Sequence, residues 1–165
     1  MSYMKKIIVI GCPGSGKSTF SKALHEIIGV PLFHLDMLKW NADKTTFDRE
    51  VFLDRLNEVL IKNEWIIDGN YGSTMELRLQ NCDTVFFLDY PLDVCLDGVR
   101  SRKGKPRFDM PWIETEEDPE FIAFIKDFNT KIRPYIIELL NKYSDKKIYT
   151  FANRNEADDF LIKLK

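Results

Sequence analysis

The sequence predicts a single domain of three α/β/α layers built around a five-stranded parallel sheet. Three observations predict this fold. Short apolar runs rich in β-branched residues alternate with helical patterns along the chain. A glycine-rich stretch at 11–19 joins the first apolar run to the first helical pattern. No repeat or linker interrupts the 165 residues. We therefore expect residues 1–165 to form one domain, long enough to bury a core.

The glycine-rich stretch matches G-x-x-x-x-G-K-[ST], the phosphate-binding P-loop. Glycine adopts backbone conformations that other residues rarely take, so successive N–H groups can surround phosphate oxygens. We expect Lys17 to reach the β- and γ-phosphates of ATP and the Ser18 hydroxyl to bind Mg²⁺. The predicted fold is accordingly the P-loop NTPase fold. The residues expected to hold the nucleotide in this loop are Gly11, Pro13, Gly14, Ser15, Gly16, Lys17, Ser18 and Thr19.

The remaining elements follow in alternation. Strands are expected at 5–10, 32–34, 65–71, 84–89 and 147–151. Helices are expected at 16–28, from 47 onward, and at 73–80, 91–102, 119–143 and 156–164. Thr46 is a plausible N-cap for the helix that begins at 47. Pro134 should kink or divide the long helix that contains it.

Two acids follow predicted strands, where ligands bind in open α/β sheets. Asp36 comes just after the second strand. We favour a functional role for it over a role as a cap or turn residue. Asp68, with Gly69, closes the third strand as a Walker B acid would, and could hold Mg²⁺ directly or through water. The alternative for this pair is a common Asp-Gly turn.

Several arginines are candidates for binding anions. Arg78 could grip a phosphate or carboxylate of the substrate, or be a surface charge. Arg133 precedes Pro134 and could face the phosphates. A basic run at 100–107 is broken by glycine and proline, which favours a loop or mobile lid. Its arginines could close over the transferring phosphate. An acidic stretch at 114–120 follows and offsets the positive potential that nucleic acid would need.

The composition limits the partners. The formal net charge is −2, so no overall positive field attracts DNA. No apolar run reaches the roughly 20 residues of a membrane span. The three cysteines are scattered, which favours a reducing cytoplasm over a disulfide framework. Cys12 lies at a variable position of the loop and is interpreted as non-catalytic.

Five stretches and the basic lid carry a resemblance to a known family: 11–19 (GCPGSGKST), 34–36 (HLD), 65–71 (WIIDGNY), 77–79 (LRL) and 87–89 (FLD). They resemble the P-loop kinases of the nucleoside-monophosphate kinase type, which include adenylate and shikimate kinases. The narrowest likeness is to bacterial DNA topology modulation proteins. It implies a sheet order of 2-3-1-4-5, an acceptor-side segment at about 37–63 and a short lid at about 102–118.

The resemblance also implies ATP and Mg²⁺ as cofactors. It places Asp36 near the acceptor hydroxyl, Arg100 and Arg102 among the lid arginines, and Asn153 and Arg154 in the loop beside the adenine. In adenylate kinases Phe-Pro-Arg follows the Asp-Gly pair, whereas Asn-Tyr-Gly follows it here. The arginine that grips a nucleoside monophosphate is therefore missing, which puts AMP as acceptor in doubt.

Two functions remain in view. The first is a kinase that transfers the γ-phosphoryl group of ATP to a small-molecule or nucleotide acceptor, with Lys17, Asp36, Arg100 and Arg102 as catalytic residues. The second is a regulatory nucleotide-binding protein that touches DNA through 100–107 and catalyses little. The sequence leaves the choice between monomer and homodimer open.

Overall fold

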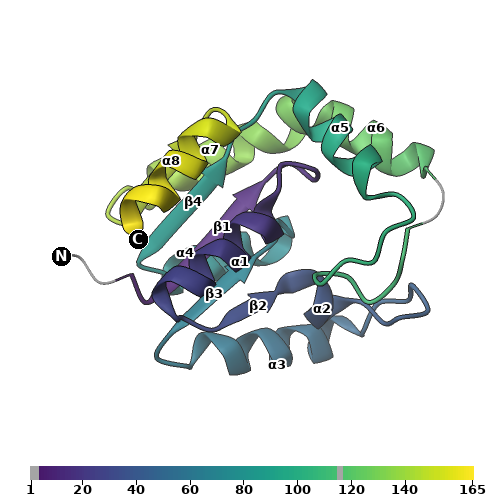
Figure 1. Cartoon of the computed structure of the whole chain (residues 1–165). Coiled ribbons are helices and arrows are strands. Elements are labelled where there is room, and N and C mark those ends of the chain that lie inside the picture. Colours follow the sequence, from purple (N-terminus) through teal and green to yellow (C-terminus); the bar gives the residue numbers. More distant parts are fainter. Residues whose placement is uncertain (1–3, 115–116) are drawn as a thin grey trace.

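Five parallel strands form one sheet in the order β2-β3-β1-β4-β5 (Figure 1). The structure is a computed structural model that describes residues 4–114 and 117–165. Residues 1–3 of the predicted domain and 115–116 of the predicted lid lie outside the described residues. The predicted sheet and its order are confirmed. The strands are β1 (Lys6–Gly11), β2 (Leu32–His34), β3 (Trp65–Asp68), β4 (Thr84–Leu88) and β5 (Lys147–Phe151).

The central strands are buried because their side chains are apolar on both faces. Ile7, Ile8, Val9 and Ile10 of β1 have no exposed surface. The strands β3 and β4 on either side of β1 are likewise buried along their whole length. Strand β5 lies at the edge and is half exposed. A continuous apolar run without polar alternation is what a parallel strand covered on both faces requires.

Helices flank this sheet. Helix α1 packs on β1, β2 and β3 as well as on α8, and α4 also packs on β1. The helices are α1 (Lys17–Ile28), α2 (Leu35–Lys39), α3 (Arg49–Leu60), α4 (Gly72–Asn81), α5 (Leu92–Arg102), α6 (Pro119–Asp127), α7 (Arg133–Lys142) and α8 (Arg154–Leu164). Among the described residues no helix combines the length and the apolar character needed to cross a bilayer.

Two details of the acceptor-side segment correct the sequence prediction. Asp36 lies in the first turn of α2, a short helix that the sequence pattern did not predict. Helix α3 begins after Asp48, so Thr46 is not its N-cap. Thr46 instead pairs with Trp40 in an antiparallel bridge that closes the turn between α2 and α3. The bridge holds Thr46 in the turn, two residues before the N-cap position at Asp48.

The long predicted helix is divided, as expected, but ahead of Pro134. A single π-helical turn, η1 (Phe128–Ile132), separates α6 from α7. Pro134 then occupies the first turn of α7, where its missing N–H removes no helical hydrogen bond. The wider turn absorbs the change of direction that proline would otherwise force on a continuous helix.

The described part of the lid has no regular structure after α5. Figure 1 shows this segment running from the end of α5 to the side of β2 and α2, then returning toward α6. Two ring contacts fix it there. The rings of Phe108 and His34 are 5.4 Å apart, and those of Trp112 and Trp40 are 5.3 Å apart. The lid thus lies over the carboxyl ends of the strands.

Candidate active site

The P-loop is shaped by close packing on helix α5. Gly14 and Gly16 have φ values of 87° and 94°, in the left-handed region. A Cβ on Gly14 would lie 1.9 Å from the carbonyl oxygen of Cys95, and a Cβ on Gly98 would lie 2.0 Å from the carbonyl oxygen of Gly14. The two backbones therefore touch directly, and any side chain at either glycine would force loop and helix apart.

Side chains from outside the P-loop hold the same stretch. Asn70 pairs with the backbone of Gly11: its Oδ1 accepts from the Gly11 N–H at 3.1 Å, and its Nδ2 donates to the Gly11 carbonyl. Arg154 Nη2 donates to the Gly14 carbonyl at 3.3 Å. Asn153 instead caps α8, because its Oδ1 accepts from the Glu156 N–H. Of the two residues predicted beside the adenine, Arg154 contacts the P-loop, whereas the Asn153 side chain caps helix α8.

Lys17 lies among opposing charges at the mouth of the loop. Its Nζ makes one long hydrogen bond, 3.5 Å, to the Cys12 carbonyl. Burial lowers the pKa of the Lys17 ammonium, and the charges of Asp68 and Asp36 counteract that effect. An ammonium group with weak local hydrogen bonding is available to an anionic ligand.

A hydrogen-bonded chain supports Asp36. Tyr71 donates its phenolic O–H to Asp36 Oδ1, and Trp40 Nε1 donates to the Tyr71 oxygen at 2.7 Å. Lys39 Nζ lies 4.0 Å from the centre of the Tyr71 ring. Burial raises the pKa of Asp36, and the hydrogen bond from Tyr71 opposes the rise. Sequence reasoning missed Tyr71. The available signal was an aromatic residue with a polar end directly after the Asp-Gly-Asn turn.

Asp68 is paired with a histidine. His34 Nδ1 and Asp68 Oδ2 are 2.7 Å apart, and both side chains are largely buried. Burial lowers the pKa of His34, but the hydrogen bond and the charge of Asp68 outweigh it, so the net shift is upward. One oxygen of Asp68 is thus engaged, and the other is the one that could bind a metal ion or water.

The His34–Asp68 pair makes stability depend on pH. Because the folded pKa of His34 lies above its unfolded value of 6.5, the pair stabilises the fold fully below that pH. The stabilisation is lost as the pH rises through the folded pKa. We expect the free energy of unfolding in urea to fall as the pH rises above about 6.5, and to fall less in His34→Gln. Asp68→Asn should flatten the dependence too. Equal slopes in all three proteins would contradict the pairing.

The lid brings one predicted arginine into the site. Arg102 is half buried, and its Nε is buried without a hydrogen-bond partner in the described structure. Burial lowers the pKa of Arg102, and the positive charge of Arg107 adds to that shift. Arg100 is different, because its side chain is 52% exposed and pairs with Glu117 at 3.0 Å. The structure therefore directs Arg102 inward and leaves Arg100 at the surface.

Arg107, the last cation of the basic run, is paired with two acids of the lid itself. Arg107 forms a two-pronged contact with Asp109, at 2.9 and 2.8 Å, and reaches Glu114 at 2.9 Å. Asp109 also lies near the Ser18 hydroxyl, which helps Arg107 to lower the pKa of the Asp109 carboxyl against the effect of burial. Asp109 was not predicted as a site residue, because the basic, irregular segment around it shows no sequence pattern that indicates such a role.

The structure places Arg78 in the interior rather than at the surface, with its guanidinium bonded to backbone carbonyls. This side chain has no exposed surface. Its guanidinium donates to the carbonyl oxygens of Gly69, Asn70 and Tyr71. Burial lowers the pKa of Arg78 to about 10. Arg78 therefore holds the turn after β3 from behind, because that turn has no regular partner for its carbonyl groups.

Arg133 is also already paired. Its Nε and Nη2 donate to the two oxygens of Asp89 at 2.8 and 2.7 Å. Asp89 thus joins the end of β4 to the start of α7. A phosphate contact by Arg133 would require this fork to open.

The oxygen donors near Ser18 fit Mg²⁺. The Ser18 hydroxyl and the carboxylates of Asp109 and Asp68 belong to the same edge of the sheet. Among the described residues, no group of three or more acids, histidines or cysteines could hold a metal ion alone. That agrees with the usual chemistry of Mg²⁺, which keeps several waters and is shared between one or two carboxylates and the phosphates of a nucleotide.

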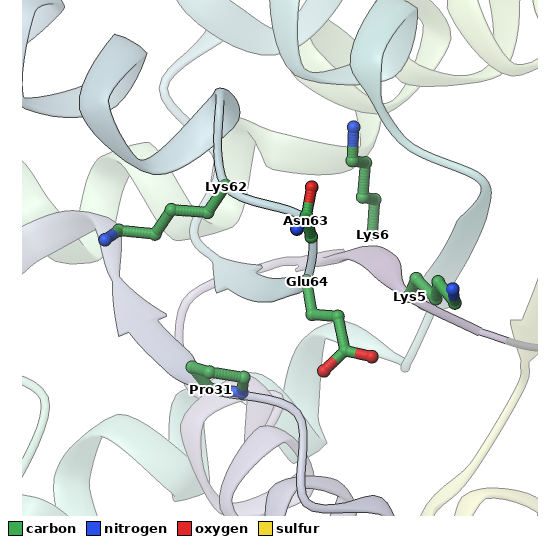
Figure 2. Close-up of a pocket in the computed structure, with 6 residues that line it drawn as sticks. All are labelled: Lys5, Lys6, Pro31, Lys62, Asn63 and Glu64. Carbon is green, nitrogen blue, oxygen red and sulfur yellow. The ribbon is translucent and has the colours of Figure 1, made fainter.

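A separate depression lies at the opposite edge of the sheet. Figure 2 shows its lining side chains, and its volume is about 610 Å³. It is lined by Lys5, Lys6, Pro31, Lys62, Asn63 and Glu64. These residues precede or begin β1, β2 and β3. The depression is therefore remote from the P-loop, which follows the carboxyl end of β1.

Fold and loop together define a class: the chain is an α/β protein with a P-loop between its first strand and first helix. No family model matches the sequence. The chain is 28% identical to an adenylate kinase of Thermotoga maritima over 109 residues, 62% of this chain and 49% of that protein. It is 30% identical to an adenylate kinase of Thermosipho melanesiensis over 121 residues, 68% of this chain and 54% of that protein. The chain spans about half the length of the curated relatives it matches.

Solved structures extend the likeness over nearly the whole chain. Shikimate kinase from Acinetobacter baumannii, in complex with shikimate, matches with a TM-score of 0.65 and 19% identity, covering 98% of this chain and 90% of that one. Shikimate kinase from Bacteroides thetaiotaomicron matches with a TM-score of 0.58 and 23% identity, covering 98% and 96%. At these identities the comparison establishes the fold.

Proposed function

We propose that this protein is an ATP-dependent phosphotransferase that acts on a small-molecule or nucleotide acceptor. The observation that carries the proposal is the complete P-loop, whose Lys17 lies at the same edge of the sheet as the acids Asp36 and Asp68. Sequence similarity to adenylate kinases and the fold shared with shikimate kinases support it. ATP would lie on the loop, with Arg102 of the lid over its terminal phosphate.

The site residues suit phosphoryl transfer, which depends on positioning and electrostatics. Lys17 and Arg102 stabilise charge on the transferring group. For a hydroxyl acceptor, the acceptor oxygen bonds to the γ-phosphorus, the bond to the β–γ bridging oxygen breaks, and Asp36 takes the hydroxyl proton. Tyr71 orients Asp36 for that step. Mg²⁺, held by Ser18 and Asp68 with the phosphates, would supply positive charge to the leaving oxygens.

The surroundings of Asp36 favour a hydroxyl acceptor over AMP. The arginine that follows the Asp-Gly pair in adenylate kinases is absent. Arg78 does not replace it, because its guanidinium is bonded to three backbone carbonyls. Screening ATP consumption against nucleosides, nucleoside monophosphates and small alcohols tests the proposal. Acceptor-dependent release of ADP supports it, and the absence of ATP binding would overturn it.

Asp36→Asn should separate catalysis from nucleotide binding. With a hydroxyl acceptor we expect kcat to fall by about 100-fold or more, because general-base catalysis contributes that much. The KM for ATP should change little, since Asp36 lies on the acceptor side. Steady-state kinetics with the acceptor found in the screen measures both constants. The control is Asp54→Asn, an exposed acid of α3. An unchanged kcat would point to an acceptor that needs no base.

The DNA-binding alternative has less support. Arg107 is bound by Asp109 and Glu114, and Arg100 by Glu117, so two arginines of the basic run are neutralised within the chain. Binding to duplex DNA at low salt, falling steeply as salt is added, would restore that alternative. A reducing cytoplasm agrees with Cys12, Cys82 and Cys95, which are all free thiols.

A further inference from the structure

One acid of the lid lies against the phosphate-binding loop. Asp109 is 7% exposed, although it belongs to an irregular surface segment. Its carboxylate lies near the Ser18 hydroxyl, the group that P-loops offer to Mg²⁺, and the neighbouring Phe108 ring packs against Lys22, one helical turn beyond Ser18. Burying a carboxylate is costly unless specific groups receive it. Its place beside Ser18 therefore needs an explanation beyond packing.

Arg107 fixes the direction of this carboxylate. Its two contacts with Asp109 are parallel and short, at 2.9 and 2.8 Å, which holds the carboxylate plane in one orientation. Arg107 also reaches Glu114 at 2.9 Å. Glu114 can therefore balance the charge of Arg107 by itself, and the group of three carries one surplus negative charge. Hydrogen bonds from Arg107 outweigh burial and lower the pKa of Asp109, so the carboxylate is ionised.

That surplus charge faces other carboxylates. The charges of Asp109 and Asp68 both act on Asp36, and each raises its pKa. Asp36 thus shares the edge at which the phosphates would bind with two acids that repel its charge. A divalent cation would relieve this repulsion and would be bridged to the protein by oxygen ligands, which Mg²⁺ prefers.

Two unpartnered polar atoms of the same site also point to a ligand. Ser15 Oγ, in the P-loop, and Arg102 Nε, at the start of the lid, are buried without a hydrogen-bond partner in the described structure. The residue Ser15 is 1% exposed. Both atoms can donate, so an anionic ligand would satisfy them. The acids near Ser18 suit a metal ion, and the unpartnered donors near the loop suit the phosphates of the nucleotide that carries it.

The lid determines whether Asp109 reaches Ser18. Phe108 and Trp112 lie on either side of Asp109 in sequence and dock on His34 and Trp40, beside the predicted acceptor site. Lys22 of α1 lies 4.9 Å from the centre of the Phe108 ring. Opening this segment would withdraw Asp109 together with both aromatic contacts.

We propose that Asp109 is a lid-borne contact to the Mg²⁺ that enters with the nucleotide, made through a metal-bound water, so that metal binding and lid closure are coupled. The inference rests on the proposed function. Asp109 is a positioning residue in this scheme: it orients the water and, through Arg107, the lid. Groups in the outer shell of a metal site commonly change metal affinity by about 10-fold or more when removed.

The test measures binding of ADP by calorimetry with and without Mg²⁺. The ratio of the two dissociation constants gives the coupling between metal and nucleotide. We expect Asp109→Asn to reduce this ratio by about 10-fold while leaving the affinity for metal-free ADP close to that of the native protein. A second readout is the tryptophan emission from the Trp40–Trp112 contact. Mg²⁺ added to the ADP complex should change this emission in the native protein and not in Asp109→Asn.

Two further variants separate a metal contact from a purely structural ion pair. Arg107→Gln releases the carboxylate from its fixed orientation but keeps its charge, so the metal coupling should fall less than in Asp109→Asn. Asp97→Asn removes an exposed acid of α5 and should behave as the native protein. Equal loss of coupling in Arg107→Gln and Asp109→Asn would overturn the inference, as would unchanged coupling in Asp109→Asn. If the native protein bound no nucleotide, the proposed function itself would fail.

Discussion

Replacing Lys17 by alanine is expected to lower kcat/KM for phosphoryl transfer by about 1,000-fold. The ammonium is the one cation of the P-loop itself, and no neighbouring residue of the loop can replace its charge at the phosphates. Burial already lowers its pKa, and two acids oppose that shift. We therefore expect the ammonium of Lys17 to interact more strongly with the phosphates of a nucleotide than with these two acids. ADP production from ATP and the identified acceptor provides the measurement.

The control for this variant is Lys62→Ala. Lys62 is exposed and lies at the opposite edge of the sheet, so its loss removes the same charge without touching the site. The melting temperatures of both variants should stay close to that of the native protein. Full transfer activity in Lys17→Ala would show that the loop is not the phosphate site.

Replacing Arg78 by alanine is expected to destabilise the protein by about 3 kcal/mol or more. Three backbone carbonyls lose their donor at once, and a large side chain with no exposed surface leaves a cavity. In a protein of this size the melting temperature should fall by about 10 °C. Thermal unfolding followed by circular dichroism measures this shift.

Gln80→Ala is the matched control, because Gln80 is exposed on the same helix α4. Its melting temperature should stay near that of the native protein. If Arg78→Ala were as stable as this control and lost only affinity for a substrate, Arg78 would be a ligand-binding residue after all.

The sequence predicted the five strands because each is an apolar run between turn-forming residues, and burial on both faces demands such a run. It predicted the P-loop because each glycine, Lys17 and Ser18 has a local task. It missed α2, whose five residues are too few to show a helical period. It also missed the start of α3, because Thr46, the expected cap, is held in the Trp40–Thr46 bridge and the helix begins after Asp48.

The candidate site divides in the same way. Lys17, Asp36 and Asp68 could be chosen because their positions beside strand ends are visible in the sequence. The roles of Arg78, Arg133 and Asp109 could not be predicted, since each depends on a partner at another point of the chain. Arg78 is bonded to backbone carbonyls, Arg133 to Asp89 and Arg107 to Asp109. The three arginines nevertheless look alike in the sequence.

By itself the sequence determined the sheet, its alternation with helices and the phosphate-binding loop, because these follow from local burial patterns and short-range backbone geometry. Only the tertiary structure decided which charged side chains are paired within the protein and which remain able to bind a ligand. Arg78 is hydrogen-bonded to the turn that it supports, whereas Nε of Arg102 has no partner among the described residues. The lid places Asp109 near Ser18. The physical reason is that a charge acts through what surrounds it, and folding assembles those surroundings from distant parts of the chain.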